Sequence, residues 1–295
     1  MAGRSNIFRL GGLLLLLGAA LLPRAGEAKP ARIVSTNVCT DQLLMQMAEP
    51  EAILSLSFLA RDPENSAMAA EAMRFPVNYG SAEEIIRLRP DLILAGEYTT
   101  RATIQLLKKL GLNVLEFPLA HTLADVRTAI RRLADAIGEE TRGDQLIASF
   151  EAALPPGHDG APPKDAPIAA LYWANGLTSG DDTLAGAILR AAGFRNLAGV
   201  LDIPGNGQIP LERLIRADPD VVITGEGESP RTPSLATEKL HHPALKKAFA
   251  GKLAGDISST AWVCGTPRVA EAIRSLHAFR LEHFSAPRVS WEDLE

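Results

Sequence analysis

The chain has 295 residues, of which 46% are hydrophobic and 22% charged, a composition typical of a folded protein and not of a disordered one. This length suits two domains, each with a core of its own. The formal net charge of −5 excludes the strongly basic surface on which nucleic-acid binding depends, so we expect no nucleic-acid partner.

The first 28 residues have the pattern of a secretory signal peptide. Arg4 and Arg9 precede an apolar run over residues 10–22, and a small-residue site ending at Ala28 follows it. The run is too short to span a bilayer comfortably, so an uncleaved N-terminal anchor is the lesser alternative. We expect residues 1–28 to be removed, leaving a soluble protein in the periplasm.

Residues 29–121 alternate short apolar strands with helices. We expect strands at 32–36, 53–57, 76–79, 92–95 and 113–117, and helices over 41–48, from Ser81 onward, and over 100–110. Strands and helices that alternate at these lengths predict a parallel sheet covered on both faces. The segment is therefore expected to form an N-terminal α/β lobe.

Residues 122–154 are expected to form a linking helix. Thr122 and Asp125 have the spacing of a capping box, and apolar residues then recur every three or four positions from Leu123 to Leu154. One uninterrupted helix of this length would span ~50 Å and join two halves as a strut. Glycine commonly ends helices, so two helices broken at Gly138 are an equal alternative.

After the helix, residues 155–167 form a connector rich in proline and glycine, and the alternating pattern resumes over 168–295. We expect strands at 168–173, 221–224 and 261–263, and helices at 183–192, 211–217, 243–249 and 267–279. This order predicts a second α/β lobe.

Part of the first lobe recurs in the second at an offset of 129 residues, because residues 81–97 match residues 210–226. The identical pairs include Glu83 and Glu212, Arg87 and Arg216, Pro90 and Pro219, Asp91 and Asp220, Gly96 and Gly225, and Glu97 and Glu226, with apolar residues matching between them. Each copy reads as helix, Pro-Asp turn, buried strand and glycine exit. Two similar lobes on either side of a strut predict a ligand-binding groove between them.

Several of these motifs resemble one family: the periplasmic binding proteins that deliver ferric siderophores, haem and cobalamin to ABC importers. The matching motifs are Arg32-Ile33-Val34-Ser35, residues 81–95, the long helix, Leu211-Glu212-Arg213 and Pro219-Asp220-Val221-Val222. The resemblance covers essentially the whole mature chain. It implies two Rossmann-like lobes with parallel sheets, joined by one long interdomain helix, and so favours the uninterrupted helix.

The resemblance also implies that one glutamate on each lobe docks onto arginines of the permease dimer, and Glu83 and Glu212 match those positions. The alternative is that a glutamate in the first turn of a helix only stabilises the helix. Glu84 occupies the capping position instead of Glu83, which leaves Glu83 free for a partner.

Ligand residues in parallel sheets lie on loops just past the carboxyl ends of strands. On those loops we expect ligand contacts from Asn37, Cys39, Arg61, Tyr79, Tyr98, Arg101, Trp173, Trp262 and Cys264. The aromatic residues suit a flat or bulky chelate, although a single aromatic is more often a core residue. The arginines suit carboxylate or oxyanion groups.

The two cysteines fall on these loops, one in each lobe, and three interpretations remain open. They are two small buried residues, which we slightly favour, or a disulfide across the groove, or thiolates that contact a metal chelate. The six histidines include no set with zinc-site spacing, so a receptor for a bare metal ion is disfavoured.

We therefore expect a monomeric binding protein that carries a metal chelate to an ABC importer, has no cofactor of its own and catalyses no reaction. A ferric siderophore is the first candidate ligand, followed by cobalamin and then haem. The alternative from another class is a secreted α/β hydrolase that uses Ser179 or Asp181.

Overall fold

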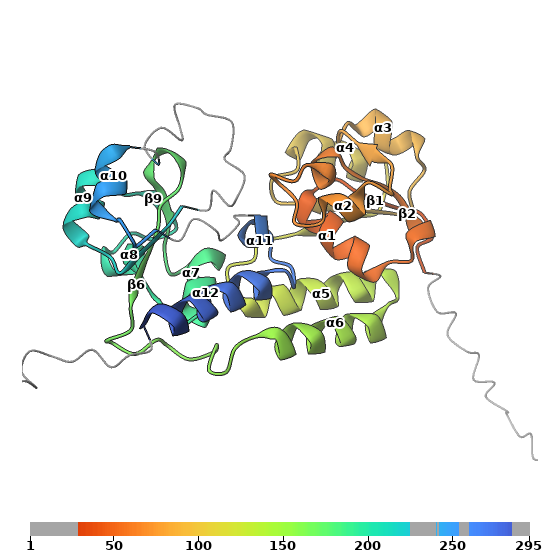
Figure 1. The fold of residues 1–295 in the computed structure, drawn as a ribbon. Coiled ribbons are helices and arrows are strands. Elements are labelled where there is room, and N and C mark those ends of the chain that lie inside the picture. The colour runs from red at the N-terminus through yellow and green to blue at the C-terminus, as the bar shows by residue number, and fades with distance from the viewer. Residues whose placement is uncertain (1–28, 225–239, 241, 254–259, 285–295) are drawn as a thin grey trace, which may run out of the picture.

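The computed structural model describes residues 29–224, 240, 242–253 and 260–284 (Figure 1). The expected signal peptide at 1–28 lies outside this part of the chain. No helix in the described ranges combines the length and the apolar character needed to cross a membrane. Two α/β lobes lie side by side above a layer of longer helices (Figure 1).

The N-terminal lobe contains a parallel sheet of five strands in the order β3-β2-β1-β4-β5, which agrees with the expected parallel sheet. Its strands are β1 (Ile33–Ser35), β2 (Ile53–Ser57), β3 (Val77–Asn78), β4 (Leu92–Gly96) and β5 (Val114–Phe117). Its helices are α1 (Val38–Met47), α2 (Ala69–Ala72), α3 (Ala82–Arg87) and α4 (Arg101–Lys109), with 3-10 turns η1 (Pro50–Ala52) and η2 (Phe58–Arg61).

The C-terminal lobe contains a smaller parallel sheet in the order β10-β6-β8, together with an antiparallel ribbon of β7 and β9 that the sequence patterns did not predict. Its strands are β6 (Ile168–Leu171), β7 (Leu177–Ser179), β8 (Arg195–Asn196), β9 (Asn206–Gln208) and β10 (Val221–Ile223). Its helices are α7 (Leu184–Ala191), α8 (Leu197–Val200), α9 (Leu211–Ala217), α10 (Pro243–Ala248), α11 (Thr260–Val263) and α12 (Val269–Phe284), and η3 (Ala174–Gly176) is a 3-10 turn.

The repeated segments occupy equivalent places in the two lobes. Helix α3 leads into β4, which pairs with β1, and helix α9 leads into β10, which pairs with β6. Arg89 and Asp218, which are 129 residues apart, both have left-handed backbone conformations, with φ of 49° and 40°. The repeat in the sequence is therefore a repeat in structure. The last matched positions, Gly225 and Glu226, lie outside the described residues.

Residues 122–154 form two helices, so the prediction of one long linking helix is wrong. Helix α5 (Leu123–Ile137) ends at Gly138, whose φ of 67° is left-handed, and α6 (Glu140–Ala153) runs back beside α5 (Figure 1). A Cβ on Gly143 would lie 2.5 Å from the Cβ of Ala134, so glycine permits the close approach of the two helices. The 15 residues of α5 span only ~22 Å.

The capping box and the apolar stripe of α5 are present as predicted. The side chain of Thr122 accepts a hydrogen bond from the Asp125 backbone, and Asp125 accepts one from the Thr122 backbone in return. The stripe residues Leu123, Val126, Ile130, Leu133 and Ile137 are all buried. The start and the buried face of α5 therefore agree with the prediction, and only the continuity of the helix past Gly138 differs.

The two lobes share one hydrophobic core. Alternate residues of β4 point to opposite faces, so that Leu92 and Leu94 belong to a large central cluster and Ile93 to a smaller outer one. In the other lobe, the same central cluster contains Val221 and Ile223 of β10. The cluster continues through helices α5, α6, α7 and α12, so apolar packing holds the lobes together.

The expected strand at 261–263 is helix α11, although its β-branched and aromatic residues favour a strand. The chain then crosses to the N-terminal lobe over residues 264–268. A Cβ on Gly265 would lie 2.3 Å from the Cβ of Ala120, and Arg268 forms an ion pair with Glu71 of α2 at 3.5 Å. The segment directly after this short helix is therefore held against the N-terminal lobe, while α11 itself packs on α7 and α12.

Candidate ligand-binding cleft

A cleft lies between the two lobes, as the repeat predicted, and it consists of two adjoining cavities. The first has a volume of 420 Å³ and is lined mainly by the C-terminal lobe, and the second has a volume of 320 Å³ and is lined mainly by the N-terminal lobe. Five residues line both: Tyr98, Leu119, Ala120, Leu184 and Val263. Each volume is in the range of small-molecule sites.

Three of the predicted aromatic residues line the cleft. Tyr98 belongs to both cavities and is 77% exposed, so it is available to a ligand. Trp173 and Trp262 line the first cavity, Trp173 half-buried and Trp262 only 6% exposed. The indole Nε1 of Trp262 has no hydrogen-bond partner among the described residues. The cleft therefore offers large aromatic surfaces to a ligand.

Polar groups in the cleft are held in place by local hydrogen bonds. Asn37 lines the second cavity and caps α1, where its Oδ1 accepts from the backbone of Cys39 at 3.0 Å. A Cβ on Gly96 would lie 2.5 Å from Cγ of Asn37, so glycine at the end of β4 makes room for this cap. In the other lobe, Ser179 Oγ donates to Asn206 Oδ1 at 2.7 Å.

Four predicted ligand residues line neither cavity: Arg61, Tyr79, Arg101 and Cys264. The Arg61 guanidinium donates to the backbone carbonyl of Phe75, and the Tyr79 ring stacks on Phe58 with 5.3 Å between centroids. Arg101 forms an ion pair with Glu116 at 3.6 Å. Lys108 and Arg101 together hold the pKa of Glu116 below its usual value.

The described walls of the cleft therefore carry little positive charge. No lysine or arginine lines the first cavity in the described ranges, and the second cavity has Arg132, whose guanidinium lies 5.6 Å from the ring centroid of Phe117. The arginines that favoured an anionic ligand in the sequence lie elsewhere.

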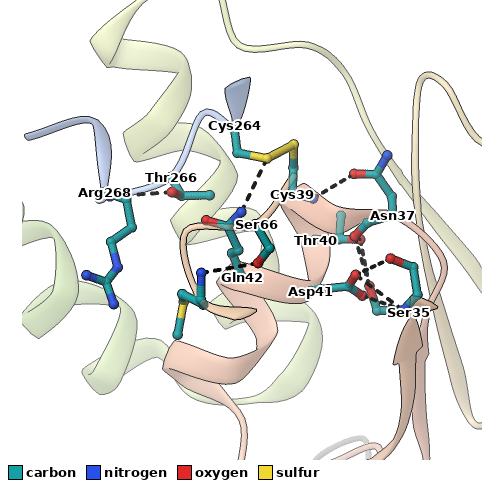
Figure 2. Close-up of a disulfide and its surroundings, with 12 residues drawn as sticks. Ser35, Asn37, Cys39, Thr40, Asp41, Gln42, Ser66, Cys264, Thr266 and Arg268 are labelled. Atoms are coloured by element: carbon teal, nitrogen blue, oxygen red, sulfur yellow. Dashed lines mark hydrogen bonds between the residues drawn. A yellow bond between two sulfur atoms is a disulfide. The ribbon is translucent and has the colours of Figure 1, made fainter. Parts of the chain in front are cut away.

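Cys39 and Cys264 form a disulfide, with 5.0 Å between their Cα atoms (Figure 2). The bond joins α1 of the N-terminal lobe to the segment that follows α11, so the favoured interpretation of two unlinked buried cysteines is wrong, and so is the interpretation as thiolate ligands. Cys39 lines the second cavity, whereas Cys264 is 1% exposed and accepts a hydrogen bond from Gln42 Nε2 at 3.6 Å.

A buried carboxyl group, that of Asp41, lies two residues along α1 from the disulfide-bonded Cys39 (Figure 2). Asp41 is fully buried and accepts hydrogen bonds from the backbone N–H of Ser57, at 3.1 and 3.2 Å, and from its hydroxyl. Burial raises the pKa of Asp41 to about 7, although the hydrogen bonds from serine side chains act in the opposite direction.

His121 lines the first cavity and is exposed, although the sequence patterns did not predict it as a site residue. The histidines have no zinc-site spacing, so the sequence patterns did not point to this residue. The signal that could have found it is its position directly before the Thr122 cap, where the chain leaves the first lobe.

The expected docking residues are on the surface, one in each lobe. Glu83 and Glu212 lie in the first turns of α3 and α9, and both are exposed. Glu84 is engaged as predicted, since its backbone donates to Ser81 and its carboxylate accepts from the backbone of Tyr79 at 2.8 Å. No hydrogen bond or ion pair of Glu83 is present within the described ranges.

Comparison with known proteins identifies the family. A family model described as "Periplasmic binding protein" matches residues 33–252, which is most of the chain. The chain belongs to the periplasmic binding protein family. Members of this family bind solutes for ABC importers and are not enzymes, so the hydrolase alternative is not supported. The predicted fold class of two α/β lobes with parallel sheets is confirmed, apart from the broken linking helix.

Relatives of this periplasmic binding protein include a "Cobalamin-binding protein" of Halobacterium salinarum, which is 23% identical over 68% of the chain and 55% of the relative. An "Uncharacterized ABC transporter substrate-binding lipoprotein YvrC" of Bacillus subtilis is 25% identical over 68% of the chain and 65% of the relative. The chain thus spans between half and two thirds of the length of these relatives.

A similar solved structure is the "Periplasmic heme-binding protein RhuT from Roseiflexus sp. RS-1 in apo form", with a TM-score of 0.68 and 22% identity. The match covers 84% of this chain and 96% of that one. At this identity the likeness establishes the fold alone.

Proposed function

We propose that this protein binds a bulky metal chelate in the cleft between its lobes and delivers it to an ABC importer from the periplasm. The observation that carries the proposal is the cleft itself, which is walled by Tyr98 from one lobe and by Trp173 and Trp262 from the other. Aromatic rings with a polar edge suit a large, flat ligand that also carries polar groups.

Among candidate ligands for this cleft, we propose a cobalamin-type chelate before a ferric siderophore. Sparse aromatic residues and available arginines favour a siderophore in the sequence, but neither Arg61 nor Arg101 lines the described cleft. A ligand without strong negative charge fits walls of aromatic, hydroxyl and amide groups better. A relative carrying the name "Cobalamin-binding protein" supports the same order.

The test is calorimetric titration of the mature protein with cyanocobalamin, haemin and a ferric hydroxamate siderophore. We expect cyanocobalamin to bind with a micromolar or lower Kd, and Trp173→Ala to weaken that binding about tenfold or more. Tyr79→Ala, an aromatic change outside both cavities, is the matched control and should leave the Kd within about twofold. Failure of all three chelates to bind would overturn the proposal.

We also propose that Glu83 and Glu212 are the contacts to the permease dimer. Both are exposed acidic side chains at equivalent places in the two lobes, so together they can fix the orientation of the protein on a two-fold partner. Charge pairs at the rim of an interface mainly affect association rate and register.

Uptake of radiolabelled chelate by cells that carry the importer tests this role. The double variant Glu83→Ala with Glu212→Ala should reduce uptake severalfold and leave the calorimetric Kd for the chelate unchanged. Glu282 is an exposed acidic residue on α12, so Glu282→Ala is the control for the loss of a negative surface charge elsewhere on the protein. Uptake equal to wild type in the double variant would contradict docking through these residues.

A further inference from the structure

His121 contacts both helix α5 and the C-terminal lobe, and these contacts fix its orientation. Its backbone N–H donates to Asp125 Oδ2 at 2.9 Å, as part of the cap of α5. Its ring Nδ1 lies 3.2 Å from the backbone carbonyl oxygen of Asp182, just before α7 in the other lobe. Asp182 is held in turn, because its Oδ1 accepts from the backbone of Gly205 at 2.7 Å. The imidazole is therefore pre-oriented at the junction of the lobes.

The contact with Asp182 also determines where the ring proton lies. A carbonyl oxygen can only accept a hydrogen bond, so Nδ1 must be the protonated nitrogen of the neutral ring. The lone pair is then on Nε2. An imidazole whose other nitrogen donates to a backbone carbonyl is the usual arrangement of a metal-binding histidine, since that hydrogen bond sets the tautomer and increases ligand basicity.

His121 is the one histidine of the described ranges that lines the cleft. It lies in the wall of the first cavity together with Trp173 and Trp262. His158 is paired with Asp159 at 3.2 Å, His242 caps α10, and His277 and His283 lie on α12. Cys39 is in a disulfide and has no thiolate to offer. His121 is thus the nitrogen donor available to a metal held between the aromatic walls.

We propose that Nε2 of His121 binds the metal of the cargo at an axial position. This inference rests on the proposed function and narrows the cargo to a planar tetrapyrrole chelate, corrinoid or porphyrin, with an exchangeable axial ligand. On binding, water leaves the metal and the Nε2 lone pair takes its place. Nε2 carries no proton in this tautomer, so neither proton nor electron transfer is required. A ferric siderophore that saturates its metal leaves no position for the imidazole.

The experiment compares aquocobalamin, whose axial water is exchangeable, with cyanocobalamin, whose cyanide blocks that position, and uses haemin as the porphyrin arm. Each ligand is titrated into wild type and His121→Gln, with binding followed by calorimetry and metal ligation by visible absorption. Glutamine keeps an N–H that can donate to Asp182 but lacks the imidazole nitrogen. His283→Ala is the control histidine.

We expect wild type to convert aquocobalamin, haemin or both to the spectrum of a nitrogen-ligated metal, and His121→Gln to abolish that conversion and weaken binding of the same ligand about tenfold. Binding of cyanocobalamin should change less than about twofold, and His283→Ala should behave as wild type. Unchanged spectra in His121→Gln, or loss of the conversion in Tyr98→Phe instead, would overturn the inference.

The comparison of these ligands also tests this inference separately from the proposed function. Cyanocobalamin that binds while no ligand shows nitrogen ligation would overturn the role of His121 and leave the function standing. If only the ferric siderophore bound, the role of His121 would likewise be overturned and the proposed function would stand. Failure of every chelate to bind would remove both.

Discussion

Asp91 and Asp220 make the same contact in the two lobes. Asp91 Oδ2 accepts a hydrogen bond from the backbone of Ala31 at 3.0 Å, just before β1, and Asp220 Oδ2 accepts one from Ile168 at 2.8 Å, at the start of β6. The Asp91 backbone also donates to Arg32, and that of Asp220 to Ile168. The repeated Pro-Asp turn thus ties the repeated strand to the first strand of each lobe.

Removing either carboxylate should destabilise the protein by about 1–2 kcal/mol, since each bond joins a charged acceptor to a backbone donor. The measurement is urea unfolding of Asp91→Ala and Asp220→Ala. Asp135→Ala, an exposed aspartate on α5, should remain within about 0.5 kcal/mol of wild type. Equal stability of all three variants would show that the turn contacts contribute nothing.

The break between α5 and α6 predicts the sign of a glycine substitution. Gly138 has a φ of 67°, and a Cβ there would lie 2.8 Å from the side chain of Lys29, so Gly138→Ala should destabilise by about 1 kcal/mol. In one continuous helix the same change would stabilise by a similar amount. Urea unfolding decides between the two, and a stabilised variant would contradict the helical hairpin.

The disulfide should contribute about 2–4 kcal/mol to stability, because it links segments that are 225 residues apart in the unfolded chain. Wild type should therefore melt at a lower temperature after reduction, and the double variant Cys39→Ala with Cys264→Ala should match the reduced protein. The double variant is also the control for the reductant, to which it should be insensitive. A melting temperature that does not change on reduction would contradict the role of the bond.

Asp41 should make stability depend on pH. Its pKa is about 7 in the folded protein and about 3.9 in the unfolded chain. The folded state therefore binds more protons between these values, and the free energy of unfolding should fall as pH rises from about 4 to 7, by at most ~1.4 kcal/mol per unit from this group.

Asp41→Asn removes the titration and keeps an oxygen that can accept from the backbone of Ser57. The difference in unfolding free energy between wild type and variant should therefore change in this pH range. The stability of wild type should fall relative to that of the variant as pH rises. Parallel pH profiles would show that Asp41 does not titrate as its burial implies.

Much of the fold follows from local signals in the sequence. Alternating apolar strands and helices gave the two α/β lobes, and the 129-residue offset located the two copies whose glutamates lie on α3 and α9. Thr122 and Asp125 gave the start of α5. Such features depend on neighbours in the chain, which a single sequence displays.

The remaining features depend on tertiary contacts. Gly138 is compatible with a continuous helix or a break, and the packing of Gly143 on Ala134 decides for the break. The segment 260–263 has strand-like residues, yet it lies between the lobes and is helical. The pairing of Cys39 with Cys264 and the position of His121 beside Asp182 each join residues distant in sequence, so no local pattern reveals them.

The position of the ligand residues was predicted in part. The rule that ligands lie past the carboxyl ends of parallel strands placed Asn37, Tyr98 and Trp173 on the walls of the cleft. The same rule also selected Arg61, Tyr79 and Arg101, whose side chains instead contact residues of their own lobe. The rule locates the edge of the sheet, whereas side-chain direction depends on local packing.

The central claim is that both lobes build one binding site, and the most direct measurement is the Kd of cyanocobalamin for two variants with one change in each lobe. Tyr98→Ala alters the N-terminal wall and Trp173→Ala the C-terminal wall. We predict that each weakens binding about tenfold. A Kd within twofold of wild type for either variant would place the ligand on a single lobe and contradict the account.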